Sequence, residues 1–221
     1  MPIPKTIYMC HKELRDIEKY SENWKKLNPE WEIKLYDDAL CEKILLEEYS
    51  QLHCDIFQFI PDGPIKADFW RVCVINKYGG LYLDADIEPF VPLSEYIEDD
   101  DDFVTCISVV YKPEREFFKS CPHWRFNPHF LMCSKNNPIL EKCIQTYIEL
   151  YENKTQYEYW NWSICKHMMT DFEIHSAKSQ IIYENGVKYK FIYETTPENC
   201  EYGGKIVFNN RYPNYIDHDF R

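Results

Sequence analysis

The sequence predicts an α/β fold, in which a central and mostly parallel sheet is flanked by helices. Two observations support this prediction. The first 60 residues alternate between short apolar runs and amphipathic helical stretches, as in strands joined by crossover helices. A helix, a turn and a strand then follow over residues 65–89. The 221 residues contain no linker, repeat or low-complexity tract, so we predict one domain over residues 1–221.

The first half of the chain is expected to supply two strands and two helices in alternation. Residues 5–10 and 32–36 have the character of short strands. Between them, residues 14–27 carry apolar side chains at helical spacing, and Pro29 closes that segment. A second helix is expected over residues 39–49. This order is typical of a parallel sheet covered by helices.

The second half is expected to add strands and a small hairpin region at the C-terminal end. Its helix begins at Pro138, because proline is favoured in the first helical turn. The segment Glu184-Asn185-Gly186 predicts a tight hairpin between residues 180–182 and 188–192. Three further strands are expected, at residues 103–110, 126–133 and 205–208.

The chain is organised around residues 65–89, which predict a helix, a Gly-Gly turn and a strand. Asp68 and Arg71 lie three residues apart at the edge of the apolar side of this helix. Gly79 and Gly80 end it where a left-handed residue is needed. The strand is expected to run to Pro89, with its apolar side chains alternating with polar ones. The residues expected on its polar face are Tyr82, Asp84, Asp86 and Glu88.

Two carboxylates, Asp84 and Asp86, are therefore expected at the C-terminal end of one strand. Open α/β sheets bind their ligands at this end. The two carboxylates repel each other unless a cation lies between them. Mn²⁺ and Mg²⁺ prefer oxygen ligands and bridge readily to phosphates. The pattern predicts an Asp-x-Asp metal site that holds a nucleoside diphosphate.

An Asp-x-Asp pair is a weak signal by itself. The same spacing recurs at Asp99/Asp101, Asp100/Asp102 and Asp217/Asp219. The first two of these pairs belong to the run Glu98–Asp102, which predicts a solvated acidic loop. Asp68 and Arg71 alone could form a surface ion pair worth under about 1 kcal/mol. The pattern becomes specific only through the succession of Asp-x-x-Arg, Tyr-Gly-Gly, apolar strand and Asp-x-Asp.

Two blocks of the chain, Asp68-Phe-Trp-Arg71 and Lys77–Asp86, resemble a known family. They are similar to the core of the Asp-x-Asp sugar transferases of glycosyltransferase family 32. The catalytic core of the large clostridial glucosylating toxins carries a similar block. Residues 3–8 and 28–38 are similar to the family's first two strands, so the likeness covers about residues 3–90. It implies the GT-A fold, with a Rossmann-like sheet.

The resemblance implies roles for particular residues. Asp68 and Arg71 would be catalytic. The residues expected to contact the nucleotide sugar are Tyr8, His11, Asp68, Arg71, Asp84, Asp86 and Asn127. The expected metal ligands are Asp84, Asp86 and His218, the last from the C-terminal tail. His11 stands where the family usually carries a tryptophan, so a smaller ring would stack on the donor base.

The activity that the resemblance implies is metal-dependent transfer of a sugar from a nucleoside-diphosphate sugar, with retention of configuration. Mn²⁺ or Mg²⁺ is the expected cofactor. A UDP-sugar is favoured over GDP-mannose as donor. A glycan or another hydroxyl compound is the expected acceptor, as in polysaccharide biosynthesis. Residues 1–110 would bind the nucleotide sugar, and residues 111–221 would lie on the acceptor side.

Composition limits the possible partners and the compartment. The formal net charge of −12 argues against nonspecific binding to nucleic acid or anionic membranes. No apolar run approaches the length of a membrane-spanning helix, so no transmembrane anchor is expected. None of the ten cysteines forms a Cys-x-x-Cys pair, which disfavours a structural zinc site. Reduced cysteines and a cytoplasmic location are expected.

Two other classes of function share these features. A metal-dependent nucleotidyl or phosphoryl transferase could use the same paired aspartates, although the sequence lacks a phosphate-cradling glycine-rich loop. A noncatalytic domain that binds a sugar or a nucleotide could have the same fold, because fold does not fix function. The products released from a nucleotide sugar separate the three classes.

Overall fold

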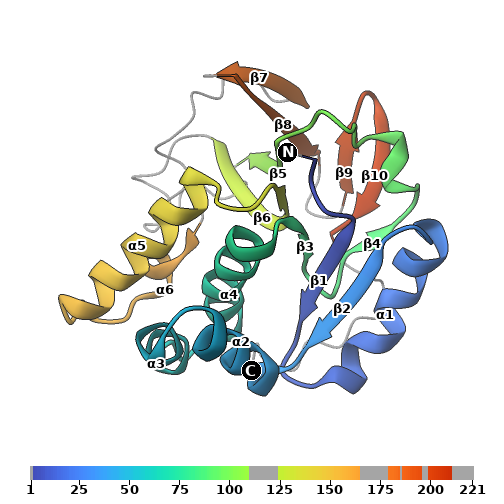
Figure 1. The fold of residues 1–221 in the computed structure, drawn as a ribbon. Helices are drawn as coiled ribbons and strands as arrows, with labels where there is room; N and C mark the ends of the chain where they lie inside the picture. The colour runs from blue at the N-terminus through green and yellow to red at the C-terminus, as the bar shows by residue number, and fades with distance from the viewer. Residues whose placement is uncertain (1, 110–123, 165–178, 185, 196–198, 211–221) are drawn as a thin grey trace.

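The computed structural model describes residues 2–109, 124–164, 179–184, 186–195 and 199–210 (Figure 1). The helices are α1 (Leu14–Leu27), α2 (Asp38–Glu48), α3 (Gln51–Phe59), α4 (Gly63–Tyr78), the 3-10 turn η1 (Leu93–Glu95), α5 (Pro138–Glu152) and α6 (Tyr159–Trp162). The strands are β1 (Thr6–Cys10), β2 (Glu32–Tyr36), β3 (Gly80–Leu83), β4 (Glu88–Pro89), β5 (Phe103–Val109), β6 (Trp124–Cys133), β7 (Gln180–Glu184), β8 (Val187–Glu194), β9 (Asn199–Tyr202) and β10 (Lys205–Asn209).

One sheet forms the centre, with strand order β2-β1-β3-β6-β5-β8-β9-β10-β4 and with β7 paired to β8. The predicted α/β class is confirmed. The sheet is mixed rather than mostly parallel: β1 runs parallel to β2 and β3, and β5 to β8, whereas the other described pairs are antiparallel. A turn at Gly203-Gly204 joins the antiparallel strands β9 and β10. β7 and β8 also pair antiparallel, which confirms the predicted hairpin.

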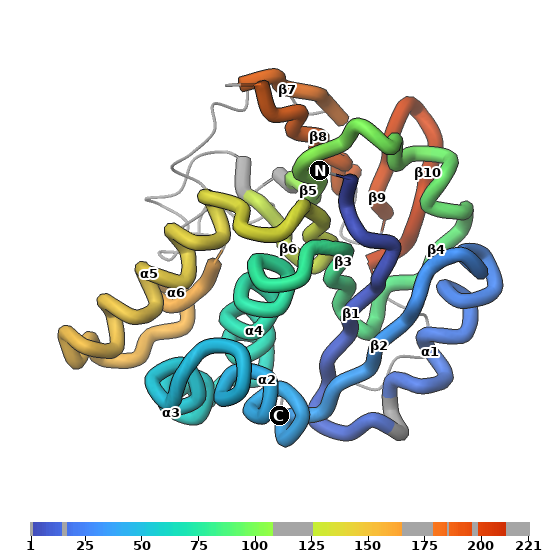
Figure 2. Tube along the Cα trace, viewed as in Figure 1, coloured from blue at the N-terminus to red at the C-terminus, as the bar shows by residue number. Residues whose placement is uncertain are grey.

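Helices cover both faces of the sheet. Buried side chains of α2, α3, α4 and α5 form one apolar cluster with Tyr8 and Tyr82. Side chains of α1 and of the segment after β3 form a second cluster with Ile7, Leu81 and Leu83. The predicted alternation along β3 is therefore confirmed. Figure 2 shows α4 running between α5 and the β1–β2 side of the sheet. None of the helices in the described parts is long and apolar enough to cross a membrane.

The turn between α4 and β3 fits only glycine. Gly80 has a φ of +112°, and a Cβ there would lie 2.6 Å from the carbonyl oxygen of Thr6 on β1. β3 ends at Leu83, so the prediction that it runs to Pro89 was wrong. The amide of Asp84 donates to the carbonyl of His129 at 2.9 Å, and the amide of Ile87 donates back to Asp84 at 3.3 Å. The chain therefore turns at Asp84 instead of continuing the ladder.

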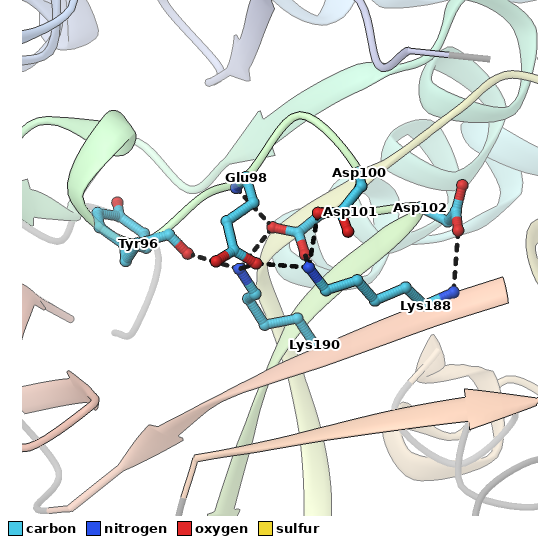
Figure 3. A network of polar contacts seen from close by, with 7 residues as sticks. All are labelled: Tyr96, Glu98, Asp100, Asp101, Asp102, Lys188 and Lys190. Atoms are coloured by element: carbon cyan, nitrogen blue, oxygen red, sulfur yellow. Dashed lines mark hydrogen bonds and ion pairs between the residues drawn. The ribbon is translucent and has the colours of Figure 1, made fainter.

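The acidic run Glu98–Asp102 is not the fully solvated loop that its charge predicts (Figure 3). Asp101 is buried, and its carboxylate lies 2.6 Å from Nζ of Lys190 and 3.2 Å from Nζ of Lys188. Both lysines come from β8, and the side chain of Lys190 is fully buried. Lys190 also donates to the carbonyl of Tyr96 at 3.0 Å. The run thus connects the segment before β5 to β8. Its buried negative charge is compensated by two lysines that are distant in sequence.

Replacing Lys190 by methionine should leave the buried carboxylate of Asp101 with less compensation. We expect the Lys190→Met variant to lose about 3–5 kcal/mol of unfolding free energy, measured by urea denaturation. The matched control is Lys205→Met on β10, which breaks only the exposed pair with Glu95 and should change stability by less than about 1 kcal/mol. Equal losses of unfolding free energy in both variants would show that the buried Lys190–Asp101 pair contributes no more to stability than an exposed pair.

Candidate functional site

A cleft of about 660 Å³ opens where β1 and β3 end and α4 begins. Six of the eight predicted site residues line it: His11, Asp68, Arg71, Asp84, Asp86 and Asn127. Helix α4 supplies two of them, Asp68 and Arg71. The carboxyl-terminal ends of the parallel strands thus form one wall, as the sequence predicted. Tyr8 and His218 were also predicted as site residues, and neither is among the described residues that line the cleft.

Tyr8 is not among the residues that line the cleft. It is 4% exposed and lies in the apolar cluster under α2–α5. Its ring stacks between those of Tyr36 and Tyr78, each at 6.3 Å between centroids. This is a position in the core, and the first-strand residues at the cleft are Cys10 and the following His11. His218 lies outside the described residues.

Arg71 joins the parts of the site. Its Nη2 atom lies 3.2 Å from Oδ1 of Asp68 and 3.1 Å from Oδ1 of Asp84. Its Nη1 donates to the carbonyl of Pro128 on β6 at 2.6 Å, and its Nε donates to Ala67 at 3.2 Å. The guanidinium also lies 4.4 Å from the centre of the Tyr82 ring. All three guanidinium nitrogens are thus held by α4, β6 and the end of β3.

Neighbouring groups stabilise the positive charge of Arg71. Burial opposes the charged form, but Asp84, Tyr82 and Asp68 together raise the pKa of Arg71. At 3% exposure the guanidinium is held inside the protein rather than extended into the cleft. The geometry fits a side chain that orients two carboxylates.

Asp68 is buried at 6% exposure, and its carboxylate is held from two sides. Its Oδ1 faces Arg71, whereas its Oδ2 accepts from the amide of Ile164 at 3.1 Å and from Oγ of Ser163 at 3.3 Å. The pKa of Asp68 is raised to about 6: burial raises it most, Arg71 lowers it, and Asp84 raises it. The group is mostly ionised at neutral pH and can accept hydrogen bonds from hydroxyl groups.

Asp84 and Asp86 both line the cleft from the turn after β3. The contacts of Asp84 within the described chain fall on Oδ1, which accepts from the Tyr82 hydroxyl at 2.9 Å and faces Arg71. Its side chain is 33% exposed. The sequence placed both aspartates on one strand face, whereas the structure brings them together on a turn. One carboxylate is therefore oriented by the protein and still accessible.

The charges around the cleft fit a divalent cation. Five carboxylates line it, against three cationic side chains, which are Lys12, Lys66 and Arg71. The surplus of two negative charges lies beside oxygen ligands of the kind that Mn²⁺ and Mg²⁺ prefer. The carboxylates are Asp38, Asp62, Asp68, Asp84 and Asp86. The residues that could hold the ion are Asp84 and Asp86.

The contribution of β6 to the site was not predicted from the sequence. The register between β5 and β6 shifts so that Thr105 faces Leu131 while Cys106 faces Asn127. The three residues between Asn127 and Leu131 form a bulge whose carbonyls hold Arg71 and the amide of Asp84. Pro128 inside a predicted strand was the available signal, because proline in a strand often marks a bulge.

Asn127 lines the cleft beside this bulge, and its amide donates to Oε2 of Glu194 on β8 at 3.0 Å. Ser163 and Ile164, which hold Asp68, gave no signal in the sequence. They lie about 95 positions from Asp68 in the chain.

Comparison with known proteins agrees with this geometry. Residues 15–104 match the family described as the glycosyltransferase sugar-binding region containing the DXD motif. This segment contains Asp68, Arg71, Asp84 and Asp86. The match covers less than half of the 221 residues. The resemblance stated from the sequence is thereby confirmed. Asp84-Ala85-Asp86 is an Asp-x-Asp pair within the matched segment, and both of its aspartates line the cleft.

Two curated relatives share about the same part of the chain. An initiation-specific alpha-1,6-mannosyltransferase from Candida albicans is 29% identical over 105 residues, which is 43% of this chain and 27% of the relative. One from Schizosaccharomyces pombe is 26% identical over 101 residues, with shares of 43% and 26%. The matched stretch thus spans about a quarter of each relative.

A solved structure supports the fold. The PaToxG glycosyltransferase superposes with a TM-score of 0.56 at 16% sequence identity, covering 76% of this chain and 68% of that one. The superposed share is larger than residues 15–104, so the likeness in fold is not confined to the matched segment.

The bond between Arg71 and Asp68 can be tested by a double-mutant cycle. The Arg71→Met variant should lose about 3–5 kcal/mol of unfolding free energy, because it leaves a buried carboxylate without its cation. Adding Asp68→Asn should recover at least about 1 kcal/mol of that loss, because the two changes remove one interaction. Chemical denaturation of the four proteins measures the coupling.

Lys77→Met on the same helix provides the control. Its ion pair with Glu48 is more than a third exposed and should contribute under about 1 kcal/mol. Strict additivity of Arg71→Met and Asp68→Asn would contradict the central role given to this buried pair.

Proposed function

We propose that this protein is a metal-dependent glycosyltransferase, which moves a sugar from a nucleoside-diphosphate sugar to a hydroxyl group of a glycan or another acceptor. The observation that carries the proposal is the arrangement of Asp68, Asp84 and Asp86 in one cleft, with Arg71 bound to the first two. The match of residues 15–104 to a sugar-binding region supports it. Binding of the metal and of the donor are parts of this proposal.

Asp84 and Asp86 would hold Mn²⁺ or Mg²⁺ together with the diphosphate of the donor. When bound, such an ion supplies charge neutralisation for the leaving diphosphate. Tyr82 and Arg71 hold Oδ1 of Asp84, so this carboxylate does not need to reorganise when the ligand arrives. Lys12 and Lys66 line the same cleft and add positive charge for the nucleotide phosphates.

Asp68 would accept hydrogen bonds from hydroxyl groups of the donor sugar, because it is fixed by Ser163 and Ile164 and lines the cleft. Arg71 would keep Asp68 and Asp84 at a fixed separation. Asn127 and His11 line the cleft as well and are proposed to contact the donor. In the reaction the bond from sugar C1 to the diphosphate oxygen breaks. The acceptor oxygen then bonds to C1 and releases its proton to the departing phosphate, with configuration retained.

The donor base and sugar are best decided by direct comparison. A divalent ion bound to a diphosphate would serve UDP-glucose and GDP-mannose equally well. The two curated relatives are named as mannosyltransferases, which favours testing GDP-mannose beside a UDP-sugar. We expect a UDP-sugar to be the better donor, as the sequence resemblance implies.

The proposed activity predicts slow hydrolysis of the correct nucleotide sugar in Mn²⁺, which releases free sugar and a nucleoside diphosphate. Asp84→Asn/Asp86→Asn should reduce this turnover by at least about 10³-fold, because the bound ion contributes several kcal/mol to charge stabilisation. Chromatography of the products with UDP-glucose and GDP-mannose in parallel measures the effect. Removal of the divalent ion by a chelator should have the same effect on the unmodified protein.

Asp99→Asn is the matched control, because Asp99 is exposed and begins another Asp-x-Asp pair. It should leave turnover unchanged. Release of a nucleoside monophosphate or pyrophosphate would instead indicate a nucleotidyl enzyme. Binding without any product would indicate a noncatalytic domain, and full turnover in the Asp84/Asp86 variant would refute the role of these carboxylates.

A further inference from the structure

A second group of side chains that could hold a metal ion lies outside the residues that line the cleft. Cys106 on β5, His129 on β6 and Cys200 on β9 each place one ligand atom within 4.8 Å of the other two. All three side chains are buried: the two cysteines are 0% exposed and the histidine is 5% exposed. The two cysteines belong to the apolar cluster that lies opposite α2–α5, and the His129 ring contacts Phe208 of the same cluster. Two thiols and an imidazole are the donor set that zinc prefers.

The sheet register explains why these side chains meet. Cys106 pairs with Ile192 on β8, and Cys200 pairs with Glu194 on the same strand. Because residues 192 and 194 share one face of β8, the two cysteines lie on the same face as well. The bulge in β6 brings His129 to this group from the other side of β5.

A disulfide between the two cysteines does not fit this arrangement. β8 lies between β5 and β9 in the sheet, so two strand spacings separate the cysteine backbones. Two such spacings amount to about 9–10 Å, whereas a disulfide joins Cα atoms no more than about 6.8 Å apart. The thiols can nevertheless approach one object placed between them.

The distance between Cys200 and His129 matches an edge of a zinc tetrahedron, and the other ligand–ligand distances are at most 4.8 Å. With Zn–S of about 2.3 Å and Zn–N of about 2.0–2.1 Å, a tetrahedral angle places sulfur about 3.6 Å from nitrogen. The Sγ of Cys200 lies 3.7 Å from Nε2 of His129. The thiol of Cys200 also donates to Oδ1 of Asn210 at 2.9 Å.

We propose that Cys106, His129 and Cys200 bind one zinc ion. This site and the Asp84/Asp86 pair differ in the metal that they prefer. Thiolate and imidazole ligands select zinc, whereas carboxylates select Mn²⁺ or Mg²⁺. The inference does not depend on the proposed transferase activity. Burial raises the pKa of both thiols when no metal is bound, and the Glu194 carboxylate raises it further for each. Zinc binding therefore releases the thiol protons to solvent as the two sulfurs become ligands.

The site would also support the cleft. The backbone carbonyl of His129 accepts from the amide of Asp84, and the neighbouring carbonyl of Pro128 accepts from Arg71. A zinc ion bound to the imidazole of His129 would hold the bulge through a side chain, whereas Arg71 and Asp84 hold it through backbone carbonyls. The ion would act as a positioning element for the carboxylates of the cleft, without contact with the substrate.

The test uses the full chain, first purified without chelators and analysed for metals, then loaded with Co²⁺ in place of zinc. We expect about one zinc ion per chain, and a near-ultraviolet charge-transfer band from thiolate to cobalt in the substituted protein. The Asp84→Asn/Asp86→Asn variant should keep this band, because its carboxylates belong to the other site. The Cys106→Ser/Cys200→Ser variant should lose both the zinc and the band.

Cys54→Ser is the matched control, because Cys54 is a buried cysteine on α3 outside the group. It should retain both the zinc and the band. If the double cysteine variant fails to fold, the spectrum of the unmodified protein decides, since the band requires a thiolate ligand. A cobalt spectrum without thiolate charge transfer, or zinc retained in full after both cysteines are replaced, would overturn the proposal.

Discussion

The cleft depends on one buried guanidinium. Arg71 is held by α4, by a carbonyl of the β6 bulge and by carboxylates from α4 and from the end of β3. The β6 bulge lies 57 positions from Arg71 in the chain, and a planar side chain with several donors can bind it and both carboxylates at once. A buried charge of this kind is stable only when it is paired, so the fold must bring Asp68 and Asp84 to it. The positions of the two carboxylates therefore follow from the need to pair the buried charge of Arg71.

The local parts of this arrangement could be predicted from the sequence. Helix α4, the Gly-Gly turn and the alternation along β3 follow from spacing and from the conformational freedom of glycine. Six of the proposed site residues reach one cleft because the ends of parallel strands and the start of α4 meet there. These are patterns within short segments, which sequence periodicity reports directly.

The parts that could not be predicted involve partners distant in the chain. The backbone groups of Pro128, His129 and Ile164 hold the site, and a carbonyl or an amide is the same in every residue. The charge of the Glu98–Asp102 run suggested solvent exposure, yet two lysines of β8 allow Asp101 to be buried. The absence of Cys-x-x-Cys argued against zinc, but that motif describes only ligands from a single turn. Cys106, His129 and Cys200 come from three strands instead.

The central claim is that the surplus negative charge of the cleft binds a divalent cation together with a nucleoside diphosphate. Electron paramagnetic resonance of Mn²⁺ titrated into the protein with UDP, and separately with GDP, tests it without requiring turnover. The account predicts that one of the nucleotides strengthens the binding of a single Mn²⁺ ion, and that replacing Asp86 by asparagine weakens it strongly. Mn²⁺ that stays free with either nucleotide, or binding that is unchanged without the Asp86 carboxylate, would contradict the account.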